Sequence, residues 1–255
     1  MLRTKIRASR IGASLVLVMS LAGSAAAQDK APDKPVLESQ LDAAIHSYIM
    51  RHPEVIQDAL AKAALTEELD RTKRILREQS DALYRAGSPV IGAANATISI
   101  VEFFDYNCPY CRKSYPTIKQ FITDNPDVRI VLKDVANLGK ESEAVARLAI
   151  ASRLQDKFQP FHDALMDRQG RTTEAVALEV ARKLGIGIEQ LKKDAVSAET
   201  SKALAITQET ATRLSVDGTP LFIVGANGIP GAPDDLAAQL TKFVDAVRKS
   251  GCYVC

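Results

Sequence analysis

One segment constrains the fold of this chain more than any other, because it joins a strand-like run to a cysteine pair and then to a helix. Residues 97–104, TISIVEFF, are β-branched and aromatic over the length of a strand. Cys108 and Cys111 follow after a short loop, and a helical pattern then continues to about Asp124. This order places Cys108 at a helix N-terminus, where unpaired N–H groups and the positive end of the helix dipole favour an anion.

The arrangement predicts a redox-active dithiol. The thiolate is the nucleophile in thiol–disulfide exchange, and an ordinary cysteine with a pKa of about 8.5 supplies little thiolate at neutral pH. We expect Cys108 to attack, and Cys111, one turn deeper, to be more buried and to resolve the mixed disulfide. Pro109 lacks an N–H group, which costs nothing in a first turn. The alternative is a zinc half-site completed by Cys252 and Cys255, which have the same spacing.

The N-terminal residues have the pattern of a cleavable export signal, which we assign to residues 1–27. Basic residues precede a 13-residue apolar run, and SAAAQ then offers an A-x-A cleavage site after Ala27. That run is too short for a membrane span. Cleavage would change the net charge from +2 to −2, because it removes four basic residues and no acidic one. This balance argues against nucleic acid as a partner, and export implies an oxidising compartment.

The remaining pattern predicts an α/β domain with a helical insertion, preceded by a long N-terminal helical arm. Pro53 and Glu54 mark the start of the long helix of the arm, and Gly87 follows its end. We assign the arm to 28–86, the catalytic domain to 87–251, the insertion to about 139–213 and a cysteine tail to 252–255. Strands are expected at 90–91, 97–104, 128–135 and from Pro220 onwards, with a turn at 228–232 and a closing helix at 233–250.

Two interpretations of the arm remain open. Leu65, Leu69, Leu76 and Leu83 lie near one helical face, and the last three have heptad spacing. The helix could fold back on its own domain. The stripe could instead hold subunits together, and we expect a homo-oligomer, a trimer or dimer, through residues 37–86.

At this point the sequence resembles a known family. VEFFDYNCPYC is similar to the active-site strand and helix of DsbA-family thioredoxin-fold oxidoreductases, and DGTPLFIVG matches the cis-proline loop of that family. The resemblance implies that Thr219 and Pro220 face the cysteines and present the substrate, with Pro109 and Tyr110 also in contact with it. It further implies that Glu102 is a buried acid that assists proton transfer, although a solvent-exposed strand glutamate is the alternative.

The N-terminal arm indicates which branch of this family the sequence resembles. HPEVIQDAL is similar to the N-terminal arm of the suppressor-of-copper-sensitivity (ScsC) type, a branch that includes trimeric disulfide isomerases. The resemblance implies a periplasmic disulfide isomerase or reductase without an organic cofactor. Its partners would be folding or misoxidised periplasmic proteins and a membrane thiol reductase or oxidase. A DsbA-like dithiol oxidase and a copper-binding or chaperone-like protein remain alternatives.

Two further features of the sequence are the cysteines of the C-terminal tail and a histidine in the helical insertion. Cys252 and Cys255 could form a local disulfide, an accessory redox pair that relays to Cys108, or a clamp for a soft metal such as Cu(I). His162 lies within the helical insertion, where we expect it to serve packing rather than catalysis.

Overall fold

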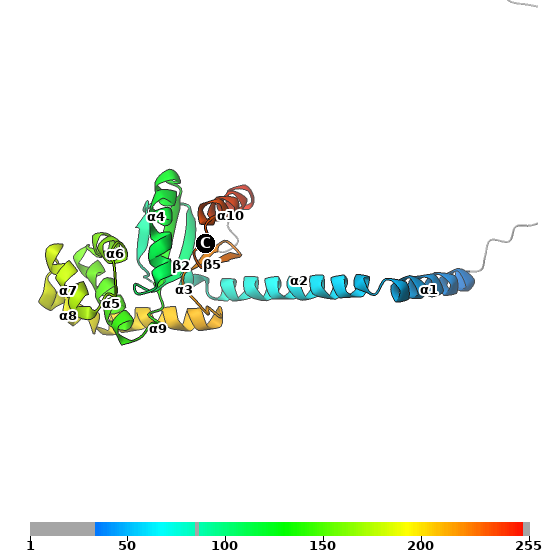
Figure 1. The fold of residues 1–255 in the computed structure, drawn as a ribbon, viewed down its shortest axis with the longest axis horizontal. Coiled ribbons are helices and arrows are strands. Elements are labelled where there is room, and N and C mark those ends of the chain that lie inside the picture. Colours follow the sequence, from blue (N-terminus) through cyan, green and yellow to red (C-terminus); the bar gives the residue numbers. More distant parts are fainter. Residues whose placement is uncertain (1–33, 85–86, 252–255) are drawn as a thin grey trace, which may run out of the picture. The chain divides into compact units, whose positions relative to one another are not determined.

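The computed structural model describes residues 34–84 and 87–251 (Figure 1). The predicted signal peptide, its cleavage site after Ala27, and the tail with Cys252 and Cys255 lie outside the described residues. The chain divides into two compact units, between Ala59 and Leu60.

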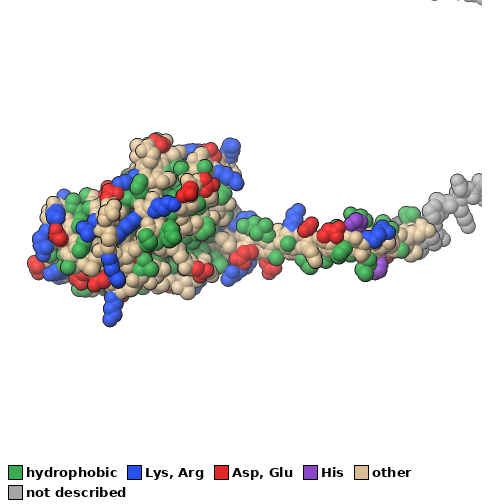
Figure 2. All heavy atoms as spheres, in the orientation of Figure 1, with side chains coloured by type: hydrophobic (Ala, Val, Ile, Leu, Met, Phe, Trp, Pro, Cys, Tyr) green, Lys and Arg blue, Asp and Glu red, His purple; other side chains and the backbone are tan. Residues whose placement is uncertain are grey.

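The first unit is helical. It holds α1 (Lys34–Arg51) and the beginning of α2 (Glu54–Glu78). Hydrophobic side chains lie at the surface of α1 (Figure 2), and Leu37, Leu41, Ile45 and Tyr48 are each about half exposed. Among the described helices, none has the length and apolar character needed to cross a membrane.

The second unit is built on a mixed five-stranded sheet of strand order β1-β3-β2-β4-β5. β2 and β3 are parallel, and every other neighbouring pair is antiparallel. The strands are β1 (Val90–Gly92), β2 (Ile98–Phe104), β3 (Val128–Asp134), β4 (Leu221–Val224) and β5 (Asn227–Pro230). β2 is central and all seven of its residues are buried, which explains its nearly continuous apolar sequence.

Alternation along β2 sends its side chains into two cores. Ile100 and Phe104 join the larger core, which also contains residues of α4 (Pro109–Asp124) and α10 (Leu236–Ser250). Val101 and Phe103 join a smaller core on the other face. Glu102 has the parity of Ile100 and Phe104, so it points to the face that carries α4.

The segment between β3 and β4 is helical, as the sequence predicts. It extends the larger core, to which Val145, Phe161, Ala177 and Leu191 contribute. The helices are α5 (Lys140–Ala151), a 3₁₀ turn (Ser152–Gln155), α6 (Phe158–Met166), α7 (Glu174–Lys183), α8 (Ile188–Ala195) and α9 (Ala198–Arg213).

The structure corrects the predicted boundary between arm and catalytic domain at residue 86. Leu76 and Leu83 are 1% and 0% exposed and pack in the smaller core against Val101 and Phe103. Leu65 and Leu69 are 62% and 46% exposed. The predicted leucine stripe is therefore divided: its first part is exposed, and its second part belongs to the core of the catalytic domain.

Two element boundaries also differ from the prediction. The single long helix expected up to residue 86 is divided at Gln79 into α2 and α3 (Ser80–Tyr84). The turn expected at 228–232 overlaps β5, which pairs with β4 in a tight hairpin. Ile229 is buried and gives this short strand its apolar anchor, while Pro230 stands at its end, where a missing N–H group is tolerated.

Candidate active site

Cys108 is the N-cap residue of α4, as the sequence predicts. Its backbone is extended, with φ −77° and ψ 120°, and Pro109 occupies the first turn. The N–H group of Cys108 donates to the carbonyl of Asp105 (3.0 Å), which holds the loop between β2 and α4 in a tight turn. The thiol therefore sits at the positive end of a sixteen-residue helix.

The environment of Cys108 favours the thiolate. The peptide bond between Thr219 and Pro220 is cis, and the Cys108 Sγ lies 3.2 Å from the Thr219 carbonyl oxygen. Hydrogen bonds from the Cys111 thiol, the Thr219 side chain and backbone N–H groups lower the pKa of Cys108 to about 5, although burial opposes this shift. Cys108 is therefore ionised at neutral pH.

Cys111 has the opposite character. It is fully buried, and burial, together with its hydrogen bond to Cys108, raises the pKa of this thiol far above its ordinary value. Both cysteines are free thiols. One nucleophilic thiolate thus lies beside one protonated, buried thiol, which suits an attacking and a resolving cysteine.

Glu102 lies inside the protein rather than in solvent. It is 1% exposed, and neither carboxyl oxygen has a hydrogen-bond partner within the described residues. Burial, and then the negative charge of Cys108, raise the pKa of Glu102 to about 8. The same carboxyl group contributes to the raised pKa of Cys111, so it is electrostatically coupled to both thiols.

The other predicted substrate-binding residues flank the nucleophile. Pro109 and Tyr110 are exposed on the first turn of α4. Thr219 is half-buried and Pro220 is buried. The structure thus brings these four residues to Cys108, while Cys252 and Cys255 lie outside the described residues.

Sequence reasoning missed a polar network that joins this loop to the helical segment. The Asp105 carboxylate accepts from the Ser142 hydroxyl (2.8 Å) and the backbone N–H of Asn107 (2.7 Å). The Asn107 amide donates to Ser142 Oγ (3.2 Å) and the Thr172 carbonyl (3.0 Å), and its oxygen accepts from the Thr172 N–H (2.7 Å). The only local signal was the polar character of Asp105 and Asn107 at the end of a buried strand.

His162 has the packing role expected from the sequence. It is fully buried among Phe104, Tyr106, Tyr115 and Phe158, and its Nδ1 lies 2.9 Å from the Tyr106 hydroxyl. Burial lowers the pKa of this imidazole to about 3, so it stays neutral.

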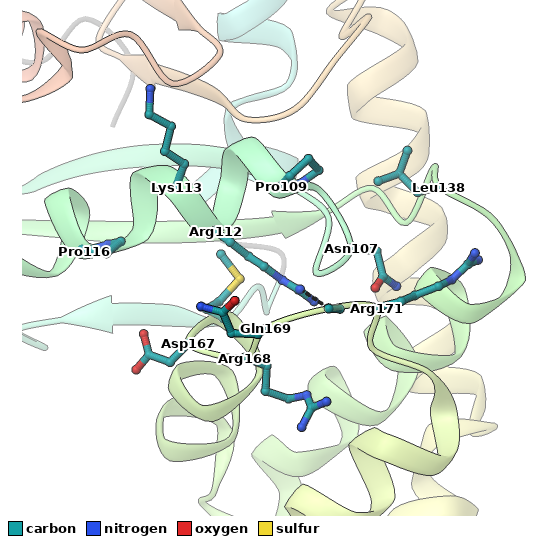
Figure 3. A pocket seen from close by; sticks show the side chains of 12 residues that line it. Asn107, Pro109, Arg112, Lys113, Pro116, Leu138, Asp167, Arg168, Gln169 and Arg171 are labelled. Atoms are coloured by element: carbon teal, nitrogen blue, oxygen red, sulfur yellow. Dashed lines mark hydrogen bonds between the residues drawn. The ribbon is translucent and has the colours of Figure 1, made fainter.

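Metal ligands do not gather in the part of the chain that the structure describes. Within residues 34–84 and 87–251, no group of three or more His, Cys, Asp or Glu side chains is placed to hold a metal ion. An open cleft of about 680 Å³ lies next to the active-site turn, and Asn107, Pro109 and Arg112 are among its lining residues (Figure 3).

Comparison with protein families gives one match, to the model of the DSBA-like thioredoxin domain, over residues 99–241. The probable disulfide bond formation protein D of Bacillus anthracis is 32% identical over 150 residues, which is 54% of this chain and 69% of that protein. The chain also matches Na⁺/H⁺ antiporters, among them NhaA 1 of Salinispora arenicola, but it spans only about a quarter of their length.

Solved structures of oxidoreductases and of ScsC are also similar to this chain. A thioredoxin-like oxidoreductase from Silicibacter pomeroyi is 37% identical with a TM-score of 0.64, and the likeness covers 67% of this chain and 98% of that one. A linker-deletion mutant of Proteus mirabilis ScsC is 26% identical with a TM-score of 0.64, and it covers 86% of this chain and 99% of its own.

Proposed function

Because the chain belongs to the family of DSBA-like thioredoxin domains, we propose that this thiol–disulfide oxidoreductase is a periplasmic protein disulfide isomerase or reductase that acts through Cys108 and Cys111. The observation that carries the chemistry is the contrast between the two thiols: the pKa of Cys108 is lowered to about 5, while that of its buried neighbour is raised. Only a pair of this kind can attack with one sulfur and keep the other protonated in reserve.

The first step is attack by the Cys108 thiolate on one sulfur of a substrate disulfide. A bond forms between Cys108 Sγ and that sulfur, the substrate S–S bond breaks, and the second substrate sulfur leaves as a thiolate that takes a proton from solvent. In isomerisation, that thiol attacks a second disulfide of the substrate, and the substrate sulfur displaced there attacks the mixed disulfide at the sulfur bound to Cys108. A new substrate disulfide forms, Cys108 leaves as the thiolate, and no net electrons are transferred.

The second step, in reduction, is attack by Cys111 on Cys108 Sγ. The mixed disulfide breaks, a disulfide forms between Cys108 and Cys111, and the substrate leaves reduced by the two electrons of the dithiol. Cys111 must lose its proton first, and Glu102 is the acceptor we assign. In the mixed disulfide Cys108 carries no charge, so one cause of the raised pKa of Glu102 disappears and its carboxylate becomes available.

The isomerase direction is supported by the first unit. Leu37, Leu41, Ile45 and Tyr48 recur at helical spacing along α1 and are each about half exposed. The likeness to Proteus mirabilis ScsC extends over 86% of this chain. We therefore propose that α1 mediates homo-oligomerisation, which would set several active sites around one misoxidised substrate.

Two matched double variants test this function in the full-length protein. Leu41→Asp with Ile45→Asp places two charges on the face of α1 that carries Leu37 and Tyr48, whereas Ser39→Asp with Ala43→Asp places two charges on the opposite, also exposed, face. The first variant should sediment as a monomer and refold scrambled ribonuclease poorly, while still reducing a small disulfide. The second should behave as the unaltered protein. Full isomerase activity in a monomeric first variant would contradict the proposal.

A dithiol oxidase is the second candidate, because the Bacillus relatives carry the name of disulfide bond formation proteins. The low pKa of Cys108 suits both directions, since it stabilises the reduced form and so makes the disulfide form oxidising. The redox state of Cys108 and Cys111 in the resting protein distinguishes an isomerase from an oxidase. Freshly prepared periplasm should contain the dithiol form of an isomerase and the disulfide form of an oxidase.

A further inference from the structure

The cleft beside the nucleophile has a strongly cationic lining. It runs from the start of α4 to the segment that follows α6 (Figure 3), and Pro109 connects it to Cys108. Four of its lining side chains are cationic and one, Asp167, is acidic. The cations are Arg112, Lys113, Arg168 and Arg171.

Neighbouring residues neutralise only the outer charges of this lining. The Lys113 ammonium lies 2.9 Å from Asp234, outside the cleft. Asp167, the one acid, lies 3.0 Å from Lys119 and is thereby neutralised itself. The excess positive charge therefore belongs to the three arginines, and within residues 34–84 and 87–251 no carboxylate forms an ion pair with any of them.

Arg112 is held in place by neutral groups. Its Nε donates to the Tyr106 carbonyl (2.8 Å), one terminal nitrogen donates to the Thr172 hydroxyl (2.8 Å), and the other donates to the Gly170 carbonyl. Figure 3 shows this side chain crossing from α4 toward the segment that bears Arg171. These bonds to neutral groups fix the guanidinium at the wall of the cleft, and the Asp105 carboxylate acts on its charge without forming an ion pair with it.

Arg168 adds a second cation close by, and no carboxylate of the described residues forms an ion pair with it, although its charge helps to lower the pKa of Glu179. Its Nε is buried and has no hydrogen-bond partner within the described residues. Burial, and then the charge of Arg168, lower the pKa of Arg112, and the negative charges of Asp105 and the two cysteines oppose this shift only in part. Arg171 is exposed at the rim. A bound carboxylate would offset these positive charges and satisfy the free donors.

We propose that this cleft binds acidic side chains of the substrate polypeptide, a few residues from the cysteine that Cys108 attacks. The inference rests on the proposed function, since it requires a substrate strand that reaches Cys108 beside Thr219 and continues into the cleft next to Pro109. The walls also include Leu138 and Met166, so the cleft fits a peptide that mixes acidic and apolar residues. The protein would then prefer substrates in which acidic residues flank the cysteine that Cys108 attacks.

A matched peptide set tests the inference. Each short peptide carries one cysteine in a mixed disulfide with a chromogenic thiol, and the flanking residues on one side are Glu in one peptide, Gln in the second and Lys in the third. The rate of reduction by the full-length reduced protein gives the preference. Serine analogues of the same peptides, measured by fluorescence anisotropy, give binding that does not depend on redox chemistry. Arg168→Gln and Arg171→Gln are the test variants, and Lys193→Gln, an exposed charge on α8, is the control.

We expect the Glu peptide to react about fivefold faster than the Gln peptide at low salt, which corresponds to about 1 kcal/mol. The preference should fall at high salt, shrink to below about twofold in either test variant, and persist in Lys193→Gln. Equal rates for all three peptides would overturn the inference while leaving the proposed function intact, and so would a preference that survives in both test variants. Faster reaction with glutathione disulfide than with the Glu peptide would also overturn it, because a small anion would then be the occupant. Acidic preference in binding without any reduction would support the cleft and contradict the proposed function.

Discussion

The division of the leucine stripe can be tested by comparing a leucine of α3 with a leucine of α2. Leu83 is 0% exposed and packs against the sheet with Leu76 and Phe103, whereas Leu65 is 62% exposed. Leu83→Ala removes three buried carbon atoms and leaves a cavity, which should lower the free energy of unfolding by about 2–5 kcal/mol. Leu65→Ala should change the stability of the unit by about 0.5 kcal/mol or less.

Urea denaturation followed by circular dichroism measures both effects. With a dependence on urea of about 1–3 kcal/mol per molar, a loss of about 2–5 kcal/mol in Leu83→Ala should lower the midpoint by about 0.7 M or more. The measurement is repeated at several protein concentrations, because association would make the apparent stability concentration-dependent. A Leu83→Ala variant as stable as Leu65→Ala would refute the packing of α3 on the sheet.

The same packing predicts that a catalytic fragment starting at residue 87 is destabilised, whereas one starting at Leu60 retains its core.

Three further predictions concern ionisable groups. The rate of iodoacetamide alkylation of the reduced protein should rise through a midpoint near pH 5, the pKa of Cys108, and be lost in Cys108→Ala; a midpoint near pH 9 would contradict the assignment. Burial lowers the pKa of Lys133 from 10.5 to about 8, so the fold disfavours the charged form, and the contribution of Lys133 to the free energy of unfolding should rise by about 3 kcal/mol between pH 8 and 10.5. In urea titrations, the difference in the free energy of unfolding between the unaltered protein and Lys133→Met should change by this amount over the same pH range, and an unchanged difference would contradict the assignment. Glu102→Gln should slow attack by Cys111 on the mixed disulfide on the order of 100-fold, measured by quenched-flow release of substrate, whereas an unchanged release rate would remove Glu102 from the mechanism.

Local patterns were sufficient to predict the reactive centre. The β-branched and aromatic run predicts a strand at Ile98–Phe104, and Pro109 after Cys108 marks the start of the helix; the structure shows that this strand is buried throughout. These signals lie within a few residues of one another, so no long-range contact was needed to interpret them. The fold class and the family followed from the same segment together with the loop at Pro220.

Contacts between distant segments could not be predicted in this way. The spacing of Leu65, Leu69, Leu76 and Leu83 shows an apolar face but not what covers it, and the structure covers only the last two within the described unit. The cleft is lined by chain segments more than fifty residues apart. The hydrogen bond from the Arg112 guanidinium to the Gly170 carbonyl joins two of them. Short strands such as β5 carry too little pattern to be distinguished from a turn.

The central claim, that Cys108 attacks disulfides and Cys111 resolves the product, is tested most directly by trapping the intermediate. Reduced Cys111→Ser protein is mixed with a disulfide-bonded peptide, quenched with acid and analysed by mass spectrometry. The account predicts a mixed disulfide on Cys108 that accumulates in this variant, decays rapidly in the unaltered protein and is absent in Cys108→Ser. A mixed disulfide that forms on Cys111 in the Cys108→Ser variant at a comparable rate, or none in Cys111→Ser, would contradict it.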